Sequence, residues 1–175
     1  AAKTLNFGIS YGMGPQAFAK QSGSSFEEAK KFITEYFADF AAVKKWQQET
    51  IEKARTFGYV ENLNGRRRWL PNINWPGRRY AAEAERAAIN MPIQGLAADI
   101  IKIAMIRVAD LLKKKKWYQT KARMLLTIHD ELLLEIDDDI LKEAMPLIKR
   151  EMEGAYKLAV PLKVASALSK NWAEA

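Results

Sequence analysis

Residues 123–136 read RMLLTIHDELLLEI, with two apolar runs on either side of His129, Asp130 and Glu131. This pattern predicts a strand, a tight turn and a second strand. Because the two runs are almost continuously apolar, both strands are expected to be largely buried. The charged triplet is then expected at the tip of a β-hairpin.

A second hairpin is predicted around Asn64-Gly65, because both residues tolerate the positive φ of a tight turn. Its strands span residues 59–63 and 66–70. The second strand carries Arg66, Arg67 and Arg68. Alternate residues of a strand point to opposite faces, so at most two of these arginines can share a face, and the third is expected in a surface ion pair.

The rest of the chain is predicted to be mainly helical. Helical spacing is found at residues 26–40 after a cap at Ser24 or Ser25, at 43–57 up to Gly58, at 80–115 with a break or bend at Pro92, and at 137–156. The expected buried residues of two helices are Val43, Trp46, Ile51 and Ala54, and Ile93, Leu96, Ile100, Ile103 or Ala104, Val108 and Leu111. Residues 3–13 fit a strand or a short helix, and 160–165 a last strand, which together indicate an α+β fold.

Composition limits the chemistry. The chain has 175 residues, 49% of them hydrophobic, with no cysteine and one histidine. Disulfides, thiolate metal sites and multi-histidine zinc sites are excluded, so any metal would need oxygen ligands. No apolar run is long enough to span a membrane and no secretion signal is seen, so the protein is expected to be soluble, cytoplasmic and without a membrane partner.

The net charge of +7 is concentrated in the middle of the chain. Residues 59–116 hold 12 basic and 5 acidic side chains, which is the whole excess. A basic stripe of this kind is typical of a protein that binds a polyanion such as nucleic acid. The alternative is an ordinary solvated surface.

Lys3, Phe7 and Tyr11 are each four residues apart, so on a helix they form one stripe. The Lys3 ammonium could pair with a triphosphate, and the aromatic rings could pack against a sugar and base. Gly8 and Gly12 would leave room for a neighbouring base pair. Such an aromatic pair could also belong to a core.

The full stretch KTLNFGISYG at residues 3–12 resembles the nucleotide-binding fingers motif of family A DNA polymerases, which resemble DNA polymerase I. The resemblance implies that Lys3, Phe7 and Tyr11 bind the incoming nucleotide, with Lys3 also taking part in catalysis. Gly12 is expected beside the DNA.

Residues 128–131, Ile-His-Asp-Glu, resemble the palm motif of the same family. The resemblance implies that Asp130 is a magnesium ligand, with Glu131 beside it and His129 near the primer end, all three in catalytic positions. Two Mg²⁺ ions are expected in the complete enzyme, since two-metal phosphoryl transfer needs hard carboxylate ligands.

Arg86 and the stretches 89–95 and 98–99 resemble the helices that contact the primer-template minor groove in this family. Arg86, Asn90 and Gln94 are four residues apart and share a face, as a check of base-pair geometry in the minor groove requires. Arg66 and Arg67, in the Gly-Arg-Arg-Arg stretch, also match the family and are expected on the DNA. The alternative for the helix residues is that they are surface residues that cap a bent helix and do not contact DNA.

The resemblance covers nearly the whole chain and implies a DNA-directed DNA polymerase of right-hand architecture. Residues 1–58 are expected to form a helical fingers portion and residues 59–175 a palm portion. The expected partners are primer-template DNA and dNTP, the complete enzyme is expected to be a monomer, and in a bacterium or phage it would be nucleoid-associated.

The chain begins inside the fingers motif, so the resemblance also implies a C-terminal fragment. The missing N-terminal part of the same polymerase would hold the other metal-binding Asp, and the fragment is expected to be inactive alone. Two alternatives remain at this point: a non-catalytic primer-template binding module and a soluble α/β interaction domain.

Overall fold

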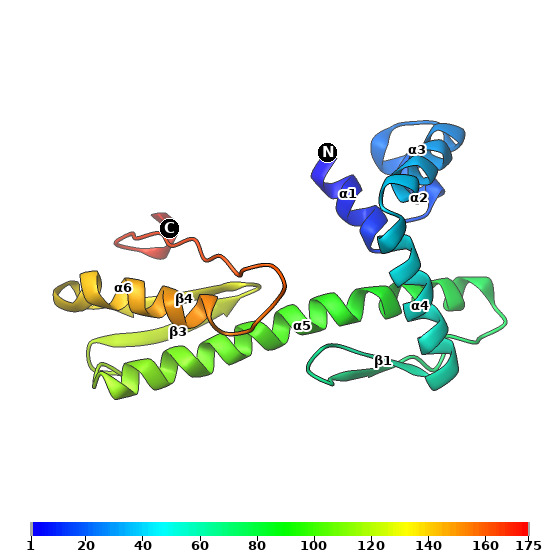
Figure 1. Cartoon of the computed structure of the whole chain (residues 1–175). Coiled ribbons are helices and arrows are strands. Elements are labelled where there is room, and N and C mark those ends of the chain that lie inside the picture. Colours follow the sequence, from blue (N-terminus) through cyan, green and yellow to red (C-terminus); the bar gives the residue numbers. More distant parts are fainter. Residues whose placement is uncertain (1, 175) are drawn as a thin grey trace. The chain divides into compact units, whose positions relative to one another are not determined.

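The computed structural model describes residues 2–174, with the backbone alone for residues 2–4, 78 and 173. Its elements are α1 (Ala2–Ser10), α2 (Pro15–Ser22), α3 (Phe26–Asp39), α4 (Ala41–Phe57), β1 (Tyr59–Glu61), β2 (Arg67–Trp69), α5 (Arg78–Lys114), β3 (Ala122–Ile128), β4 (Glu131–Ile136), α6 (Asp138–Glu153) and η1 (Trp172–Glu174) (Figure 1). The expected α+β composition is confirmed. Residues 1–96 and 97–175 form two compact units, and each is described by itself.

The N-terminal helices of the first unit pack around Ile9, Phe18 and Ala29, one buried residue from each of α1, α2 and α3. Ser25 begins α3 in a capping box: its hydroxyl accepts from the Glu28 backbone N–H, and its own N–H donates to the Glu28 carboxylate. The short helix α2 was not predicted, because only Phe18 among its residues is buried. Its start, Gly14 followed by Pro15, is nevertheless a usual helix start.

The buried side of α4 differs from the prediction. Gln47, Thr50 and Ala54 are its buried residues, whereas Val43, Trp46 and Ile51 are only half-buried. Two polar residues can be buried here because both are hydrogen-bonded. The Gln47 amide donates to the Ser10 carbonyl at 2.8 Å, and the Thr50 hydroxyl donates to the Trp46 carbonyl at 2.7 Å.

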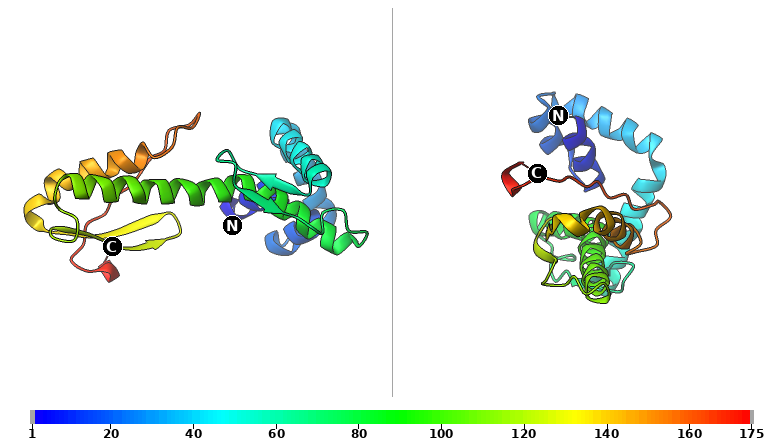
Figure 2. Two further views of the ribbon diagram at one scale, coloured as in Figure 1. Left: turned by 90° about the horizontal axis from the view of Figure 1, so that it is seen from below. Right: turned by 90° about the vertical axis from the view of Figure 1, so that its left-hand side faces the viewer.

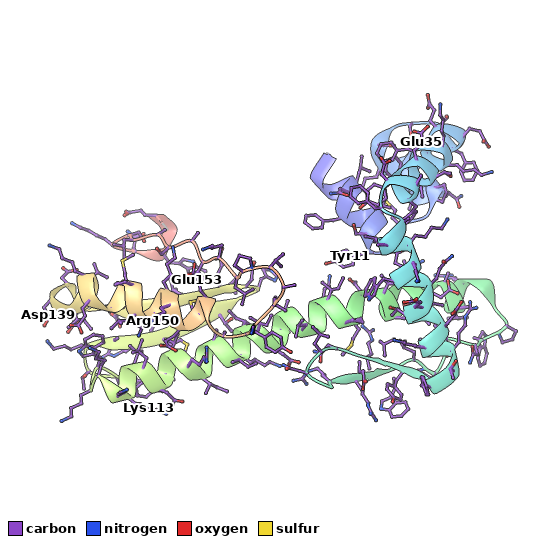
Figure 3. All side chains as sticks on the ribbon, viewed as in Figure 1. Tyr11, Glu35, Lys113, Asp139, Arg150 and Glu153 are labelled. Atoms are coloured by element: carbon purple, nitrogen blue, oxygen red, sulfur yellow. The ribbon has the colours of Figure 1, made fainter. Side chains whose placement is uncertain are left out.

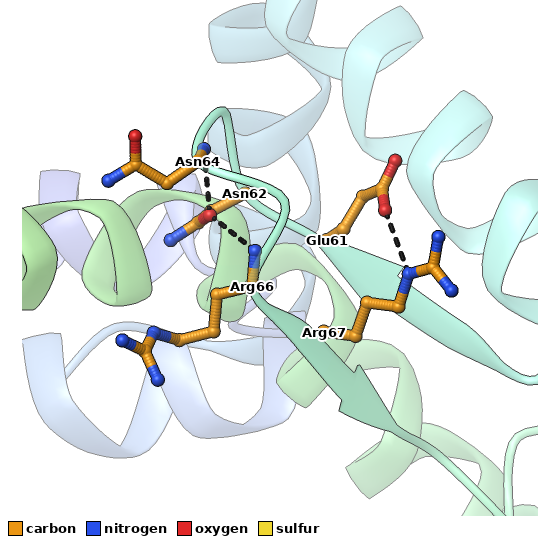
Figure 4. A network of polar contacts seen from close by, with 5 residues as sticks. All are labelled: Glu61, Asn62, Asn64, Arg66 and Arg67. Carbon is orange, nitrogen blue, oxygen red and sulfur yellow. Dashed lines mark hydrogen bonds and ion pairs between the residues drawn. The ribbon is translucent and has the colours of Figure 1, made fainter.

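The β1–β2 hairpin is present as predicted, but its turn differs. Glu61 pairs with Arg67, and of the two expected turn residues only Gly65, at φ +76°, has a positive φ. The Asn62 side-chain oxygen accepts from the backbone N–H groups of Asn64 and Arg66, which fixes the turn from inside (Figure 4). Beneath it, the first unit has a core of α4, hairpin, loop and α5 residues: Ala54, Val60, Leu70, Ile73, Ala84, Ala88 and Met91.

Helix α5 runs without interruption through Pro92, so of the expected break or bend, the break is wrong. Proline removes only one donor from the helical ladder, and side chains packed on both sides of it can offset that loss. Of the predicted stripe, Leu96, Ala104 and Val108 are buried, while Ile93 is exposed and Leu112, not Leu111, is fully buried at its end.

In the second unit, the β3–β4 ribbon packs with α6 and the second half of α5 (Figure 2). The strands are present as predicted, but the expected burial of both is wrong. Ala122 is buried, whereas Leu125 is 51% exposed and lies in a β-bulge between Met124 and Leu126. The cause is that helices cover one face of a two-stranded ribbon, and the bulge turns side chains away from them.

Helix α6 contributes the regularly spaced buried residues Ile140, Ala144 and Ile148, as its sequence period predicts. The predicted strand at 160–165 is wrong: that segment has no strand pairing, and the Val164 N–H donates to the Glu153 carboxylate at 3.0 Å. Pro161 also has no backbone N–H to donate to a neighbouring strand.

Within residues 2–174, no helix is both long and apolar enough to cross a membrane.

The boundary between the two compact units falls between Leu96 and Ala97, within α5. The hairpin β1–β2 therefore groups with the N-terminal helices, because it shares a core with α4 and the first half of α5. The assignment of residues 1–58 to fingers and 59–175 to palm stays a prediction.

Candidate functional site

Helix α1 has one buried and one accessible side. Ile9 is fully buried, while Phe7 is 50% exposed on the predicted stripe. The side chain of Lys3, the first residue of that stripe, lies outside the described residues. The end of α1 is held by the Gln47 amide and by Ser10, whose hydroxyl is 3.2 Å from the Tyr36 hydroxyl. These contacts fix the end of α1, one turn after Phe7.

Tyr11 lies just beyond the last turn of α1, with its N–H donating to the Phe7 carbonyl at 3.0 Å (Figure 3). Its side chain is half-buried. The predicted stripe therefore continues past the helix end, with Phe7 and Tyr11 on successive turns of backbone.

The surroundings of Gly8 and Gly12 explain why each of these two positions is a glycine. A Cβ on Gly8 would lie 2.4 Å from the Met13 terminal methyl, so the Met13 side chain lies over Gly8. Gly12 has φ +83°, and a Cβ there would lie 3.3 Å from Ile89 and 3.4 Å from the Arg86 side chain. The structure thus brings Gly12 and Arg86, both predicted DNA contacts, side by side.

On the first half of α5, Arg86, Asn90 and Gln94 follow one another at four-residue intervals, each rotated by roughly 40° about the helix axis. Arg86 and Gln94 are exposed, and Asn90 is half-buried. The Asn90 side-chain oxygen is buried and accepts no hydrogen bond from any residue whose side chain is described. A buried acceptor without a donor is destabilising, which is common at sites that bind a ligand.

Among the hairpin arginines, Arg67 forms the ion pair: its Nε lies 3.1 Å from the Glu61 carboxylate, and its guanidinium lies 4.5 Å from the centroid of the Tyr59 ring. The backbone N–H of Arg66 donates to Asn62, which directs the chain out of the turn (Figure 4). Arg67, which was predicted to contact DNA, is therefore in a surface ion pair.

In the second unit, the predicted triplet lies at the tip of the β3–β4 hairpin. Ile128 pairs with Glu131, so His129 and Asp130 form a two-residue turn. His129 has φ +54°, a left-handed conformation that costs a residue with a Cβ on the order of 1 kcal/mol or more. Strain of this kind in a turn is common at functional sites.

The side chains of His129, Asp130 and Glu131 are all exposed. Two adjacent carboxylates at a hairpin tip are suitable oxygen ligands for Mg²⁺. The described part of the chain holds no group of three or more His, Asp or Glu side chains arranged for a metal ion. The tip therefore offers part of a coordination shell.

Sequence reasoning missed three residues that shape these sites: Gln47, Asn62 and Met13. Gln47 and Met13 act through tertiary contacts with α1, for which the local sequence has no signal. For Asn62 a signal was present, since asparagine before a turn often accepts hydrogen bonds from backbone N–H groups two residues ahead.

The chain belongs to the family described as DNA polymerase family A, whose model matches residues 1–174. It is 45% identical over its whole length to the thermostable DNA polymerase I of Thermus filiformis, and 41% identical over 99% of its length to DNA polymerase I of Lactococcus lactis subsp. cremoris. In each case the chain spans about a fifth of the length of the relative.

A solved structure shows the same fold. The POL domain of Pol1 from M. smegmatis, in complex with DNA primer-template and dNTP, matches with a TM-score of 0.87 and 40% sequence identity. The match covers 93% of this chain and 28% of that chain. The predicted family and its mixed helix and antiparallel-sheet fold are confirmed.

Proposed function

We propose that the protein to which this chain belongs carries out template-directed DNA synthesis, transferring a nucleotide from dNTP to a primer 3′ end. Membership of family A along the whole chain is the observation that carries the proposal. It is supported by the related M. smegmatis POL domain, which was solved with primer-template and dNTP. Primer-template DNA and dNTP are therefore the proposed partners.

The incoming nucleotide is assigned to the accessible side of α1. The half-exposed Phe7 ring would pack against the sugar and base, and Tyr11 would line the insertion site on the following turn. Lys3, on the same stripe by its position in the sequence, would hold the triphosphate. The firm support of α1 by Gln47 favours this role, because a positioned ring loses little freedom on binding.

We assign the contacts with primer-template DNA to Gly12, Arg66, Arg67, Arg86, Asn90 and Gln94, with His129 near the primer end. Gly12 lies close to the Arg86 side chain, which an added Cβ would meet at 3.4 Å, and this links the nucleotide motif to the first of these helix residues. Asn90 is half-buried one turn further along α5, and its side-chain amide group would donate to the N3 and O2 acceptors of the minor groove.

Asp130 is assigned as a Mg²⁺ ligand, with Glu131 beside it. When bound there, divalent cations would supply charge neutralisation for the triphosphate and activate the primer 3′ hydroxyl. Because the described part of the chain offers only an incomplete coordination shell, we propose that these 175 residues do not extend a primer by themselves.

Primer extension by the intact protein, with and without Asp130→Asn, tests the proposal. Loss of a metal ligand is worth several kcal/mol, so kcat is expected to fall by on the order of a thousandfold. Glu135→Gln is the matched control, because Glu135 is an exposed carboxylate of the same hairpin away from the tip, paired with Arg123. Primer-template binding without any extension by the unsubstituted protein would support the binding module instead.

A further inference from the structure

Three aromatic rings and a guanidinium gather on the outer face of the β1–β2 hairpin. Tyr59 and Trp69 are paired across the strands, edge to face, with ring centroids 5.1 Å apart. The Phe57 ring, at the end of α4, lies 6.2 Å from the Tyr59 ring, and the Arg67 guanidinium lies over Tyr59 at 4.5 Å. Together, Phe57, Tyr59, Arg67 and Trp69 are called the aromatic face.

The aromatic face lies outside the core of its unit. Phe57 is 60% exposed and Trp69 is 67% exposed, whereas Val60 and Leu70 on the other side of the hairpin are buried. The rings are held in place by the cross-strand pair and by the adjacent helix end. Contiguous exposed aromatic surface of this kind usually marks a site of interaction.

The charge around the face indicates what kind of partner it fits. Residues 53–70 contain five basic residues, Lys53, Arg55, Arg66, Arg67 and Arg68, and one acidic residue, Glu61. Arg55 is paired with Glu85 of α5 and Arg67 with Glu61, so the five positive and two negative groups leave a net charge of +3. An apolar protein partner would gain nothing from this excess of basic side chains. Aromatic rings surrounded by basic side chains are the usual means of binding unpaired bases and their phosphates.

We propose that the aromatic face binds single-stranded DNA, with bases stacked on Trp69 and its neighbours and the phosphates attracted by the surrounding cations. A duplex does not suit the face, because its bases are already stacked on each other and present only their edges. The choice of DNA as the occupant rests on the proposed function. The site goes beyond that function, since stacking requires neither a nucleotide triphosphate nor a metal ion.

The test is the affinity of the intact protein for a fluorescently labelled oligo(dT), without primer or dNTP. Stacking is worth about 1 to 3 kcal/mol per base, so Trp69→Ala is expected to weaken binding by about 5- to 150-fold. Trp69→Phe, which keeps a ring, is expected to retain most of the affinity. Trp75→Ala is the matched control, because Trp75 is an exposed tryptophan of the loop that follows the hairpin.

An abasic oligonucleotide of the same length separates stacking from charge, and its affinity is expected to be the same for the unsubstituted protein and for Trp69→Ala. An unchanged oligo(dT) affinity in Trp69→Ala, an equal loss on the abasic strand, or an equal loss in Trp75→Ala would each overturn the proposal. The two proposals fail separately. If the protein extends no primer, its oligo(dT) affinity can still depend on the Trp69 ring. If it extends primers but its oligo(dT) affinity is the same in Trp69→Ala, the single-stranded DNA site is absent.

Discussion

Phe7 is the residue at which the structure and the proposed function meet most directly, because it lies on a helix whose end is held by Gln47, yet half of its surface is accessible. Phenylalanine offers no hydroxyl. A nucleotide that lacks its own 3′ hydroxyl would therefore leave a polar gap beside this ring, which is unfavourable. A tyrosine at the same place could fill part of that gap.

We therefore expect the intact protein to discriminate against dideoxynucleotides, and Phe7→Tyr to remove most of that discrimination. A hydrogen bond of this kind is worth about 1 to 3 kcal/mol, so the selectivity should change by about 5- to 150-fold. The measurement is the ratio of kcat/KM for deoxy and dideoxy substrates. A ratio that is the same in both proteins would show that Phe7 does not face the sugar.

Gly12 supports a prediction about stability. Alanine there would have to adopt φ +83° and would bring a Cβ to 3.3 Å from Ile89. The left-handed conformation alone costs about 1 to 2 kcal/mol, and the tight contact adds to it. Gly12→Ala should therefore lower the free energy of unfolding, measured by urea denaturation, by more than Gly23→Ala does.

Gly23 is a suitable control because it has a similar φ, +77°, but no atom within 4 Å of an added Cβ. The difference between the two variants isolates the contact between the α1 turn and α5. Equal losses in the two would mean that Ile89 and Arg86 move aside without cost.

At the scale of elements, the capping box of α3 makes stability depend on pH. The pKa of Glu28 is lowered, first by the hydrogen bond from the Ser25 backbone N–H and then by that from the Ser25 hydroxyl. A carboxyl with a lowered pKa in the folded state stabilises the fold above its unfolded pKa of 4.5. This stabilisation is lost as the pH falls through the lower folded value.

Glu28→Gln should therefore reduce the rise in stability seen when the pH is raised through this acidic range. The check is the pH profile of the unfolding free energy of both proteins. Glu27→Gln serves as the control, since Glu27 lies in the same first turn but outside the capping box. Identical profiles for wild type and Glu28→Gln would contradict the role of the capping box.

At the scale of the whole molecule, the charge of +7 comes from residues 59–116, which carry 12 basic and 5 acidic groups. Duplex binding by the intact protein should therefore be largely independent of sequence and steeply dependent on salt. Six to ten phosphate contacts would weaken binding by about 10³- to 10⁵-fold between roughly 50 and 200 mM salt. A flat salt response, or a strong preference for one duplex sequence, would count against this assignment.

The amino-acid sequence by itself determined the features of this protein that depend on neighbours along the chain. A helix cap at Ser24 or Ser25, the stop of α4 at Gly58, both hairpins and the helix after Asp137 follow from short-range spacing and turn chemistry. The motifs at 3–12 and 128–131 were sufficient to predict the family, because whole strings of residues in a fixed order are far more specific than composition.

Only the tertiary structure decided what each apolar or polar side chain meets. Gln47 is buried because the carbonyls at the end of α1 lie beside it, and Leu125 is exposed because helices cover only one face of its ribbon. Likewise, Pro92 is accommodated within one continuous helix, and Met13 fills the space over Gly8. Hydrophobic period shows which residues share a face, but burial depends on the partner that covers that face, and such partners come from residues far away in the sequence.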